Sequence, residues 1–567
     1  MIISRARPSA IAVALIIVGG ALRLALTLAG WPALNSDEAV TGIMASQIAF
    51  DGAHPIYYAG QNYMGAIEAY LAAPLFWLFG PSLLAIRAGS ILMDMGFFAC
   101  VYLIGTLLYD ARVALSALAF VVFGGPEMLV RQIEAAGGYR ETLLFGSLVI
   151  LLAGWLAISA PPPGKRAGVT PYHTAWGFFG LGLAAGLGFW SDFLILPYLL
   201  LAFALVAACR WRDLRSRLGA LLALGMLVGV SPVIIHDLRA HGSESVFMTL
   251  WMLETMHHAS PLQAPLSIGG HLAGTFIISL PNMLGADVLC SLPVQTSADI
   301  FSPVGASAAG CIALRAAWSS GFLLLGMLAV VATARPLWEL RSQWFQQSWN
   351  DDQWRAATRH LARLALLLSA ALTILLYVLN PGSANTPWPS ERYLLPVLIA
   401  MPAVLSPMWR LRPLRLAWRG VVLPARSLRR GILMALLLAV MSGSLLAWDR
   451  APAARATAAR RAQLGQFLES KGITRVYTDY WTCIALAYET HERIVCIVMS
   501  TPKSRGLARF PEWTPLVEAD PCAAWLVPHH VAAFKNFATT GPPGGARWAR
   551  IRVAGYTIWQ PCPPSAR

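Results

Sequence analysis

Repeated apolar runs of about 20 residues constrain the fold of this chain more than any other feature of its sequence. A helix of that length crosses the hydrocarbon core of a bilayer, which is about 30 Å thick. Charged residues make up only 13% of the chain, roughly half of their share in soluble globular proteins. The runs therefore predict a polytopic α-helical membrane protein with about eleven transmembrane helices. They cover residues 8–29, 83–108, 113–127, 141–160, 174–190, 193–208, 218–236, 316–334, 361–379, 391–408 and 431–448.

The basic residues indicate which ends of these runs face the cytoplasm. The formal net charge of +15 would suggest nucleic-acid binding in a soluble protein. Here Lys and Arg gather in alternate loops, with 21 on one predicted side and none in residues 30–82. Cytoplasmic loops carry such an excess. The pattern predicts a cytoplasmic N-terminus and no nucleic-acid partner. The first run follows Arg5 and Arg7 and has no cleavage site, so we expect it to remain as a signal anchor.

The apolar stretch from Met64 to Gly80 is at the short limit for a transmembrane helix and contains Glu68 and Pro74. If it crossed the membrane, the later basic loops would fall on the outer side. We therefore predict a juxtamembrane helix here. Residues 30–82 would then form one long outer loop with two surface helices.

Two acidic residues, Asp37 and Glu38, follow the first apolar run directly. Ser36 is predicted as the N-cap of a helix that places both acids in its first turn. Apolar residues then recur at helical spacing: Val40, Ile43, Met44 and Ile48. Acids in a first turn can simply complement the helix dipole. The alternative is that they perform chemistry at the membrane surface.

Two later segments carry further charges on the same predicted side. They contribute Arg131, Glu134, Arg140 and Glu141 from the third outer segment, and Arg392 with Tyr393 after the loop 380–389. Charges at the mouth of a transmembrane helix are costly unless they pair or serve a substrate. Salt bridging and interfacial anchoring remain the alternative interpretations.

Several function classes lack their signatures. Gly180, Gly182 and Gly186 resemble a dinucleotide loop, but they lie inside an apolar run without a preceding strand. They favour close helix packing instead. The chain has no phosphate-binding Walker loop, serine-hydrolase elbow or zinc-protease motif. An interfacial helix is predicted near residues 246–251. His257 and His258 are adjacent to each other in the sequence, but no third ligand accompanies them to make a metal site.

Five of the eight cysteines fall in segments predicted to lie outside the cytoplasm. They are Cys290, Cys483, Cys496, Cys522 and Cys562. Disulfides are permitted there. Cys483 with Cys496, or Cys522 with Cys562, are candidate pairs, and small buried thiols are the alternative.

From Asp449 onward, short alternating runs replace the long apolar ones. They predict helices at 453–471 and 529–537, and strands at 474–477, 493–498, 523–527 and 550–559. The chain therefore divides into a transmembrane domain, residues 1–449, and a small α/β domain, residues 450–567. An odd number of transmembrane helices places the α/β domain outside the cytoplasm.

In this order, the features resemble those of the GT-C glycosyltransferases, especially the bacterial branch of aminoarabinose transferases and protein O-mannosyltransferases. The resemblance covers roughly residues 8–450. It rests on Ser36-Asp37-Glu38, the aromatic juxtamembrane helix, Arg87 at the start of the second span, an acid in the second major outer loop, and Arg392-Tyr393-Leu-Leu-Pro396. The chain departs from the aminoarabinose branch at Asn62-Tyr63, where that branch has Lys-Pro, and at Asp192, where a lysine is often found.

The resemblance implies a GT-C-like fold and a membrane glycosyltransferase. Such an enzyme moves a sugar, with inversion, from a polyprenyl-phosphate carrier to an extracytoplasmic lipid, glycan or protein. It would lie in the bacterial inner membrane, with its α/β domain in the periplasm. Asp37 would be the general base, with Glu38 beside it. The second catalytic acid maps to Glu141, with Glu134 as the other candidate.

The resemblance also suggests which side chains bind the substrates. Arginine can hold two phosphate oxygens at once, so Arg392, Arg140 and Arg87 are the predicted donor-phosphate ligands. Tyr63, Glu68, Tyr139 and Tyr393 are the predicted sugar- or acceptor-binding residues. Some relatives use a divalent metal near the acids, but the sequence offers no ligand set for one. We expect Asp37 and Glu141 to face one cavity.

A transporter or flippase for a lipid-linked sugar is the alternative function, since it also needs many spans and charged helix ends. A carrier should place ionisable residues near the middle of the bilayer. Here they gather at one face, with Arg23 and Asp94 as the main exceptions.

Overall fold

The computed structural model describes most of the chain, in two compact units. The described residues are 3–163, 172–239, 245–246, 248–249, 267–346, 349–410, 414–416, 421–542 and 548–561. Three residues of the predicted interfacial helix (Phe247, Leu250 and Trp251), both His257 and His258, and Cys562 lie outside them. Unit 1 comprises Met1–Arg23, Ile91–Gln132 and Gly138–Ala447, and unit 2 comprises Leu24–Ser90, Ile133–Gly137 and Trp448–Arg567.

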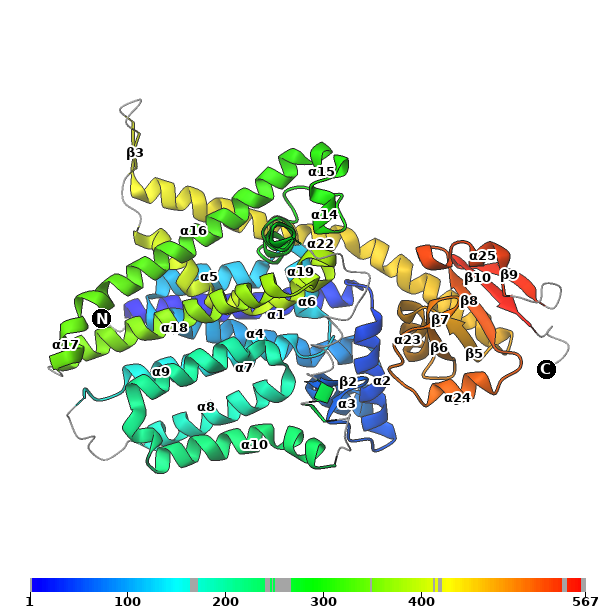
Figure 1. Cartoon of the computed structure of the whole chain (residues 1–567), viewed down its shortest axis with the longest axis horizontal. Helices are drawn as coiled ribbons and strands as arrows, with labels where there is room; N and C mark the ends of the chain where they lie inside the picture. Colours follow the sequence, from blue (N-terminus) through cyan, green and yellow to red (C-terminus); the bar gives the residue numbers. More distant parts are fainter. Residues whose placement is uncertain are drawn as a thin grey trace. The chain divides into compact units, whose positions relative to one another are not determined.

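Unit 1 consists almost entirely of helices (Figure 1). Its longer ones are α1 (Ile3–Leu28) and α4 (Leu83–Leu108), each in part, α5 (Ala111–Phe123), α6 (Pro126–Ile133), α7 (Tyr139–Ile158), α8 (Tyr172–Ser191), α9 (Leu196–Leu214), α10 (Arg217–Arg239), α16 (Ala309–Glu339), α18 (Asp351–Leu379) and the first part of α22 (Ala425–Ser470). Its shorter segments are η1 (Phe193–Ile195), α12 (Ile268–Ala273), the π-helix η3 (Gly274–Ser279), α13 (Leu280–Met283), α14 (Ser297–Ile300), α15 (Pro303–Ser307), α17 (Arg341–Gln346), α19 (Gly382–Asn385), α20 (Pro387–Ser390), the 3-10 helices η4 (Glu391–Ala400) and η5 (Ser406–Arg410), α21 (Met401–Leu405), and strands β3 (Leu414–Leu416) and β4 (Val421–Leu423).

The helices confirm a multi-pass membrane protein, with one change to the predicted count. Among the described residues, nine helices are long and apolar enough to cross a membrane, or ten if the pair α5 and α6 is one broken span. That pair bends by 81°, because Gly124 has a φ of +45° and Pro126 starts the next helix. The remaining predicted span, residues 174–190, is the helix α8, which contains five glycines and is not among these nine or ten.

Glycines let α8 and α10 pack with their backbones in contact, and the two helices lie side by side (Figure 1). A Cβ added at Gly182 would lie 2.0 Å from the main-chain oxygen of Leu222. One added at Gly186 would lie 2.5 Å from that of Met226. The predicted role of Gly182 and Gly186 in close helix packing is confirmed.

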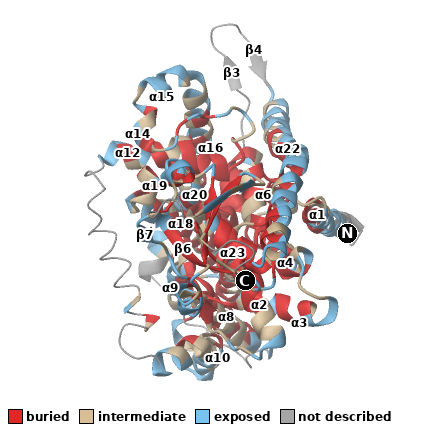
Figure 2. Cartoon of the chain, turned by 90° about the vertical axis from the view of Figure 1, so that its right-hand side faces the viewer, coloured by how far each residue is buried: buried red, intermediate tan, exposed pale blue. Residues whose placement is uncertain are grey.

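Much of the apolar surface of α10 is not covered by protein. Figure 2 shows this helix mainly in the colours of exposed and intermediate residues. Its exposed apolar side chains are Leu224, Leu227, Val228, Ile234, Ile235 and Leu238. In a soluble protein such a surface would aggregate, whereas in a bilayer it contacts acyl chains.

Arg23 and Asp94 form a fully buried ion pair between α1 and α4, with Arg23 Nε 3.3 Å from Asp94 Oδ2. The Arg23 guanidinium also donates hydrogen bonds to the main-chain oxygens of Gly19 (3.0 Å) and Val122 (2.9 Å), and to the Gln132 side chain. These contacts tie α1, α4 and α5 together. The two charges that stood out within the spans therefore hold helices together.

Unit 2 joins the segment after α1 to the C-terminal residues. The first segment forms α2 (Ser36–Phe50), β1 (Tyr57–Tyr58), β2 (Gln61–Gly65) and α3 (Ile67–Phe79). With 13 residues, α3 is about 20 Å long, too short to cross a hydrocarbon core of about 30 Å. A non-spanning helix was predicted here, and its existence is confirmed.

The C-terminal part of unit 2 contains a six-stranded mixed sheet in the order β7-β6-β5-β8-β10-β9. Its strands are β5 (Arg475–Thr478), β6 (Val495–Thr501), β7 (Ser504–Arg505), β8 (Ala524–Pro528), β9 (Ala549–Val553) and β10 (Tyr556–Gln560), with α23 (Tyr480–Glu489), α24 (Trp513–Glu518), η6 (Ala532–Phe534) and α25 (Phe537–Thr540). β5 pairs in parallel with β6 and β8, and the remaining pairs are antiparallel. The predicted small α/β fold is confirmed.

Three details of this part differ from the prediction. The single strand expected at 550–559 is a hairpin, because Ala554 and Gly555 both have positive φ and form a tight turn between β9 and β10. The helix expected at 529–537 is replaced by the short η6 and α25. The helix α23 was not predicted.

Two disulfides lie within the described residues. Cys483–Cys496 is one of the predicted candidate pairs and joins α23 to β6. Cys290–Cys311, in unit 1, was not predicted.

Candidate active site

The two acids that follow the first span lie in the first turn of α2, as predicted. The cap is Asn35, whose Oδ1 accepts a hydrogen bond from the Glu38 N–H at 2.8 Å, so the predicted cap at Ser36 is wrong by one residue. The Ser36 hydroxyl is used elsewhere. It donates to the main-chain oxygens of Tyr480 (3.0 Å) and Trp481 (2.8 Å), in the first turn of α23.

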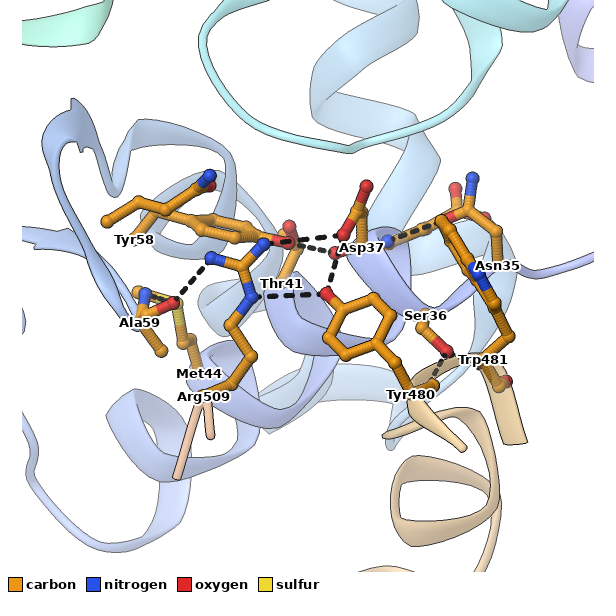
Figure 3. Close-up of polar contacts among 12 residues, drawn as sticks. Asn35, Ser36, Asp37, Thr41, Met44, Tyr58, Ala59, Tyr480, Trp481 and Arg509 are labelled. Atoms are coloured by element: carbon orange, nitrogen blue, oxygen red, sulfur yellow. Dashed lines mark hydrogen bonds and ion pairs between the residues drawn. The ribbon is translucent and has the colours of Figure 1, made fainter. Parts of the chain in front are cut away.

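Asp37 is surrounded by two tyrosines and an arginine (Figure 3). The Tyr480 hydroxyl donates to Asp37 Oδ1 at 2.6 Å, and Arg509 Nη2 lies 3.5 Å from the same oxygen. Arg509 Nε also donates to the Tyr480 hydroxyl at 3.1 Å, while the Tyr58 hydroxyl donates to the Asp37 main-chain oxygen. The Asp37 side chain remains 17% exposed. A carboxylate held in this way is accessible to a substrate and has a fixed orientation.

The environment keeps both tyrosines protonated. Burial raises the pKa of the Tyr480 hydroxyl above its usual range, and the charge of Asp37 raises it further, while Arg509 opposes the shift. Burial and Asp37 act in the same direction on the pKa of Tyr58. Both hydroxyls therefore act as hydrogen-bond donors at neutral pH.

Glu38 and Arg87, predicted as catalytic and phosphate-binding residues, form a fully buried bidentate pair. Arg87 Nε donates to Glu38 Oε1 and Arg87 Nη2 to Glu38 Oε2, both at 2.7 Å. Arg87 Nη2 also donates to the Pro32 main-chain oxygen (2.9 Å), and the Ala135 N–H donates to Glu38 Oε1 (3.1 Å). This pair fixes α2, and hence Asp37, against α4.

Two of the predicted sugar- or acceptor-binding residues, Tyr63 and Glu68, belong to unit 2. Glu68 is buried, and its Oε2 accepts the Gly137 N–H at 2.7 Å. The Tyr63 hydroxyl accepts a hydrogen bond from Gln61 Nε2 at 2.8 Å. Glu68 therefore fixes the segment 133–137 to α3.

Unit 1 brings together a second group of predicted residues around Arg392. The Arg392 guanidinium carbon lies 5.5 Å from the ring centre of Tyr139 and 5.4 Å from that of Tyr393. Both distances allow cation–π attraction. Arg140 and Glu141 follow Tyr139 in the first turn of α7 and are buried, and Arg140 Nη1 donates to the Arg131 main-chain oxygen at 3.1 Å.

A buried hydrogen-bonded chain holds the start of η4, where Arg392 lies. Arg315, on α16, donates to the Asn282 side-chain oxygen and to the Ile277 main-chain oxygen (3.0 Å). Asn282 Nδ2 in turn donates to Glu391 Oε2 at 2.8 Å. Since Glu391 directly precedes Arg392, this chain orients the arginine.

Asp192, in the turn between α8 and η1, is buried beside this group. Its Oδ1 accepts the Leu194 N–H at 2.9 Å. Burial raises the pKa of Asp192 to about 7, although the Leu194 N–H and the charge of Arg392 oppose the shift. In an unfolded chain the same group has a pKa of about 3.9.

The raised pKa of Asp192 predicts that stability falls as the pH rises. Between about pH 4 and pH 7 the folded protein holds a proton that the unfolded chain has lost, so folding is favoured at low pH and this contribution is lost through pH 7. Asp192→Asn, which stays neutral and can still cap η1, should flatten the dependence of the thermal midpoint between pH 5 and pH 8. Asp110→Asn, at the exposed cap of α5, should leave it unchanged. Equal slopes for the wild type and Asp192→Asn would contradict this assignment.

Within the described residues, no group of three or more His, Cys, Asp or Glu side chains is arranged to hold a metal ion. The acids of unit 2 are instead engaged by arginine, tyrosine and main-chain N–H groups. We therefore assign no metal ligands.

Tyr480 and Arg509 were missed from the sequence, although one signal for Tyr480 was present. Asp479-Tyr480-Trp481 directly follows β5, a strand that pairs in parallel on both sides. Polar and aromatic residues at the carboxyl ends of parallel strands often form binding sites. For Arg509, in a loop, the sequence gave no comparable signal.

The fold of the described residues is similar to that of solved structures, one of which matches almost the whole chain. ArnT from Cupriavidus metallidurans in the apo state is similar over 96% of this chain and 97% of its own, with 12% identity and a TM-score of 0.51. The same protein bound to undecaprenyl phosphate matches over 97% and 98% of the two chains, with 12% identity and a TM-score of 0.49. The oligosaccharyltransferase of Archaeoglobus fulgidus matches over 86% of this chain and 64% of its own, with 12% identity and a TM-score of 0.49.

Sequence comparison adds no relative to these structures. No protein-family model matches the chain, and no curated protein matches it either. At 12% identity, the likeness to ArnT establishes the fold, and the reaction has to be argued from the residues.

Proposed function

We propose that this protein is an integral-membrane glycosyltransferase that moves a sugar from a polyprenyl-phosphate carrier to an extracytoplasmic acceptor. The observation that carries the proposal is Asp37, a partly exposed carboxylate directly after the first span, held by a tyrosine and an arginine within an ArnT-like fold. The acceptor is a lipid, glycan or protein. The protein lies in the bacterial inner membrane, with a cytoplasmic N-terminus and a periplasmic α/β domain.

Asp37 acts as the general base in a single displacement. The acceptor oxygen attacks the anomeric carbon and forms the new glycosidic bond, while its proton passes to the Asp37 carboxylate. The bond between the anomeric carbon and the phosphate oxygen breaks, and polyprenyl phosphate leaves with the electron pair. Displacement from the opposite face inverts the anomeric centre. Glu141 is the second catalytic acid, and Glu38 orients Asp37 through its pair with Arg87.

Arginines meet the charge of the phosphate. Arg392, between Tyr139 and Tyr393, is the first candidate because its guanidinium is oriented by two rings and suits two phosphate oxygens at once. Arg140 and Arg87 are the further candidates. Tyr63, Glu68, Tyr139 and Tyr393 are proposed to bind the sugar or the acceptor.

An apolar groove in unit 1 suits the lipid part of such a donor. It has a volume of about 400 Å³ and is lined only by apolar residues of α13, α16, α18, η4 and α21, including Phe322, Met327, Leu367 and Val397. η4 lines this groove and also carries Arg392. A polyprenyl chain that enters this groove from the bilayer exchanges lipid contacts for van der Waals packing against these side chains.

The test is to identify the product and then measure its formation. Envelope glycolipids and glycoproteins of strains with and without the gene are compared by mass spectrometry. Transfer of labelled sugar from the polyprenyl-phosphate fraction is then measured in membranes that contain the protein. A product that depends on the gene, and on added polyprenyl-phosphate sugar, supports the proposal. Movement of the lipid-linked sugar across vesicles without any new glycosidic bond would instead identify a flippase.

A further inference from the structure

We propose that Tyr480 and Arg509, from the C-terminal α/β part, are positioning residues for Asp37, so that this part of the chain completes the active site. The inference rests on the proposed function. It assigns a role to residues more than 400 positions away from Asp37 in the sequence. All of the residues involved belong to unit 2.

Tyr480 and Arg509 both contact one carboxylate oxygen of Asp37. Tyr480 donates its hydroxyl hydrogen to Asp37 Oδ1, and Arg509 Nη2 faces the same atom (Figure 3). Arg509 also donates to Tyr480, so the three side chains form a closed triangle. With one oxygen held from two sides, rotation of the carboxylate is restricted. A base whose orientation is fixed in advance is already aligned to accept the proton of the acceptor hydroxyl.

Tyr480 itself is held rigidly. It is the first residue of α23, and the Asp479 side chain caps this helix by accepting from Trp481 N (2.9 Å) and Thr482 N (3.3 Å). One turn later, the disulfide Cys483–Cys496 joins α23 to β6. The Ser36 hydroxyl binds the Tyr480 main-chain oxygen. The start of α23 is therefore fixed both to its own sheet and to α2.

Arg509 is only 5% exposed. Its Nη1 donates to the Ala59 main-chain oxygen at 3.2 Å. The guanidinium carbon lies 5.2 Å from the ring centre of Tyr58 and 5.6 Å from that of Tyr480. A buried cation needs such partners to offset its lost hydration. Arg509 is thus directed at Asp37 by Tyr58, Ala59 and Tyr480.

The packing between α2 and α23 leaves these helices little room to move relative to each other. A Cβ added at Gly42 on α2 would lie 2.5 Å from the Tyr488 ring on α23. Arg461, on α22, donates to the Leu34 main-chain oxygen at 2.7 Å and forms an ion pair with Glu489. These contacts set the spacing between α2 and α23. The triangle around Asp37 is therefore part of one packed body.

The test compares variants that change one contact at a time in the full-length protein. Tyr480→Phe removes only the hydroxyl, and Arg509→Ala removes the cation. Each should lower kcat about 10–100-fold, the usual cost of losing a group that orients a functional side chain. The KM for the polyprenyl-phosphate sugar, extracted from the native membranes, should change little in both variants, and the thermal midpoint should change little in Tyr480→Phe.

A chemical rescue separates positioning from a purely structural role. Guanidinium ions at millimolar concentration should restore part of the activity of Arg509→Ala, because they can occupy the space beside Asp37 that the side chain leaves. They should not restore Asp37→Asn, which lacks the carboxylate itself. A fold that had simply been weakened would not regain activity in guanidinium.

The chain offers matched controls in the same sheet domain. Tyr477→Phe alters a tyrosine in β5 that stacks on Trp525 and does not contact Asp37. Arg505→Gln, in β7, breaks a surface ion pair with Glu518 at the end of α24. Both variants should transfer sugar at the wild-type rate.

The outcomes separate this inference from the proposed function. If Asp37→Asn is inactive while Tyr480→Phe and Arg509→Ala work at the wild-type rate, the inference is overturned and the proposed function stands. If Asp37→Asn itself keeps the wild-type rate, the proposed mechanism fails and the inference fails with it. A lower thermal midpoint without any guanidinium rescue also overturns the inference.

Discussion

Asp37→Asn should lower the rate of sugar transfer by about 10²–10⁴-fold, the usual contribution of a general base. The amide has nearly the same size as the carboxylate and can still accept the hydrogen bond from Tyr480. It cannot take up the proton of the acceptor hydroxyl. The initial rate of labelled-sugar transfer, per amount of protein in the membrane, measures the effect.

Asp51→Asn is the control for this variant, because Asp51 is an exposed acid at the other end of α2. It should transfer sugar at the wild-type rate. Wild-type transfer by Asp37→Asn would exclude Asp37 as the base. Loss of transfer in both variants would show that activity responds to any change in α2.

Glu38→Gln should destabilise the protein by about 3–5 kcal/mol, because it leaves the Arg87 guanidinium buried without its counter-charge. Both side chains are fully buried, and each guanidinium–carboxylate hydrogen bond measures 2.7 Å. Arg87→Met should have an effect of similar size, since it leaves the Glu38 carboxylate unpaired. Thermal unfolding of the purified protein in detergent measures both effects.

The control for the buried pair is the ion pair Arg335–Glu339 on α16, whose side chains are 80% and 63% exposed. Arg335→Gln should change the midpoint little, because water screens exposed pairs. If Glu38→Gln unfolds at the same temperature as the wild type, the pair does not fix α2. Transfer activity of Glu38→Gln, measured below its midpoint, then tests the predicted catalytic role of Glu38 separately.

The sequence predicted the helices of the membrane region well, because one physical requirement dominates there. A helix that crosses a bilayer needs a long apolar run, and every predicted run is helical in the structure. The exceptions have local causes. Gly124 and Pro126 break the helix in the run at 113–127. In α8, glycines allow close packing against α10.

The sequence predicted only those parts of the candidate site that a pattern of neighbouring residues indicates. Asp37 was recognised because an acid pair follows an apolar run, and α3 was predicted not to cross the membrane because a further span would have put the later basic loops on the outer side. Tyr480 and Arg509 were not, since a single sequence does not reveal contacts between positions so far apart. The same limit applies to the pair Cys290–Cys311 and to the pair Glu38–Arg87. That Asp37 and Glu141 face one cavity stays a prediction.

Unit 2 is assembled from three stretches of chain, Leu24–Ser90, Ile133–Gly137 and Trp448–Arg567. The ribosome makes the first of them well before the last. The segment with Asp37 must therefore wait, without the residues that pack on it, while the intervening helices are inserted. A nascent or truncated chain without Trp448–Arg567 would hold an incomplete centre, so the protein acquires its proposed activity only after this stretch has been made.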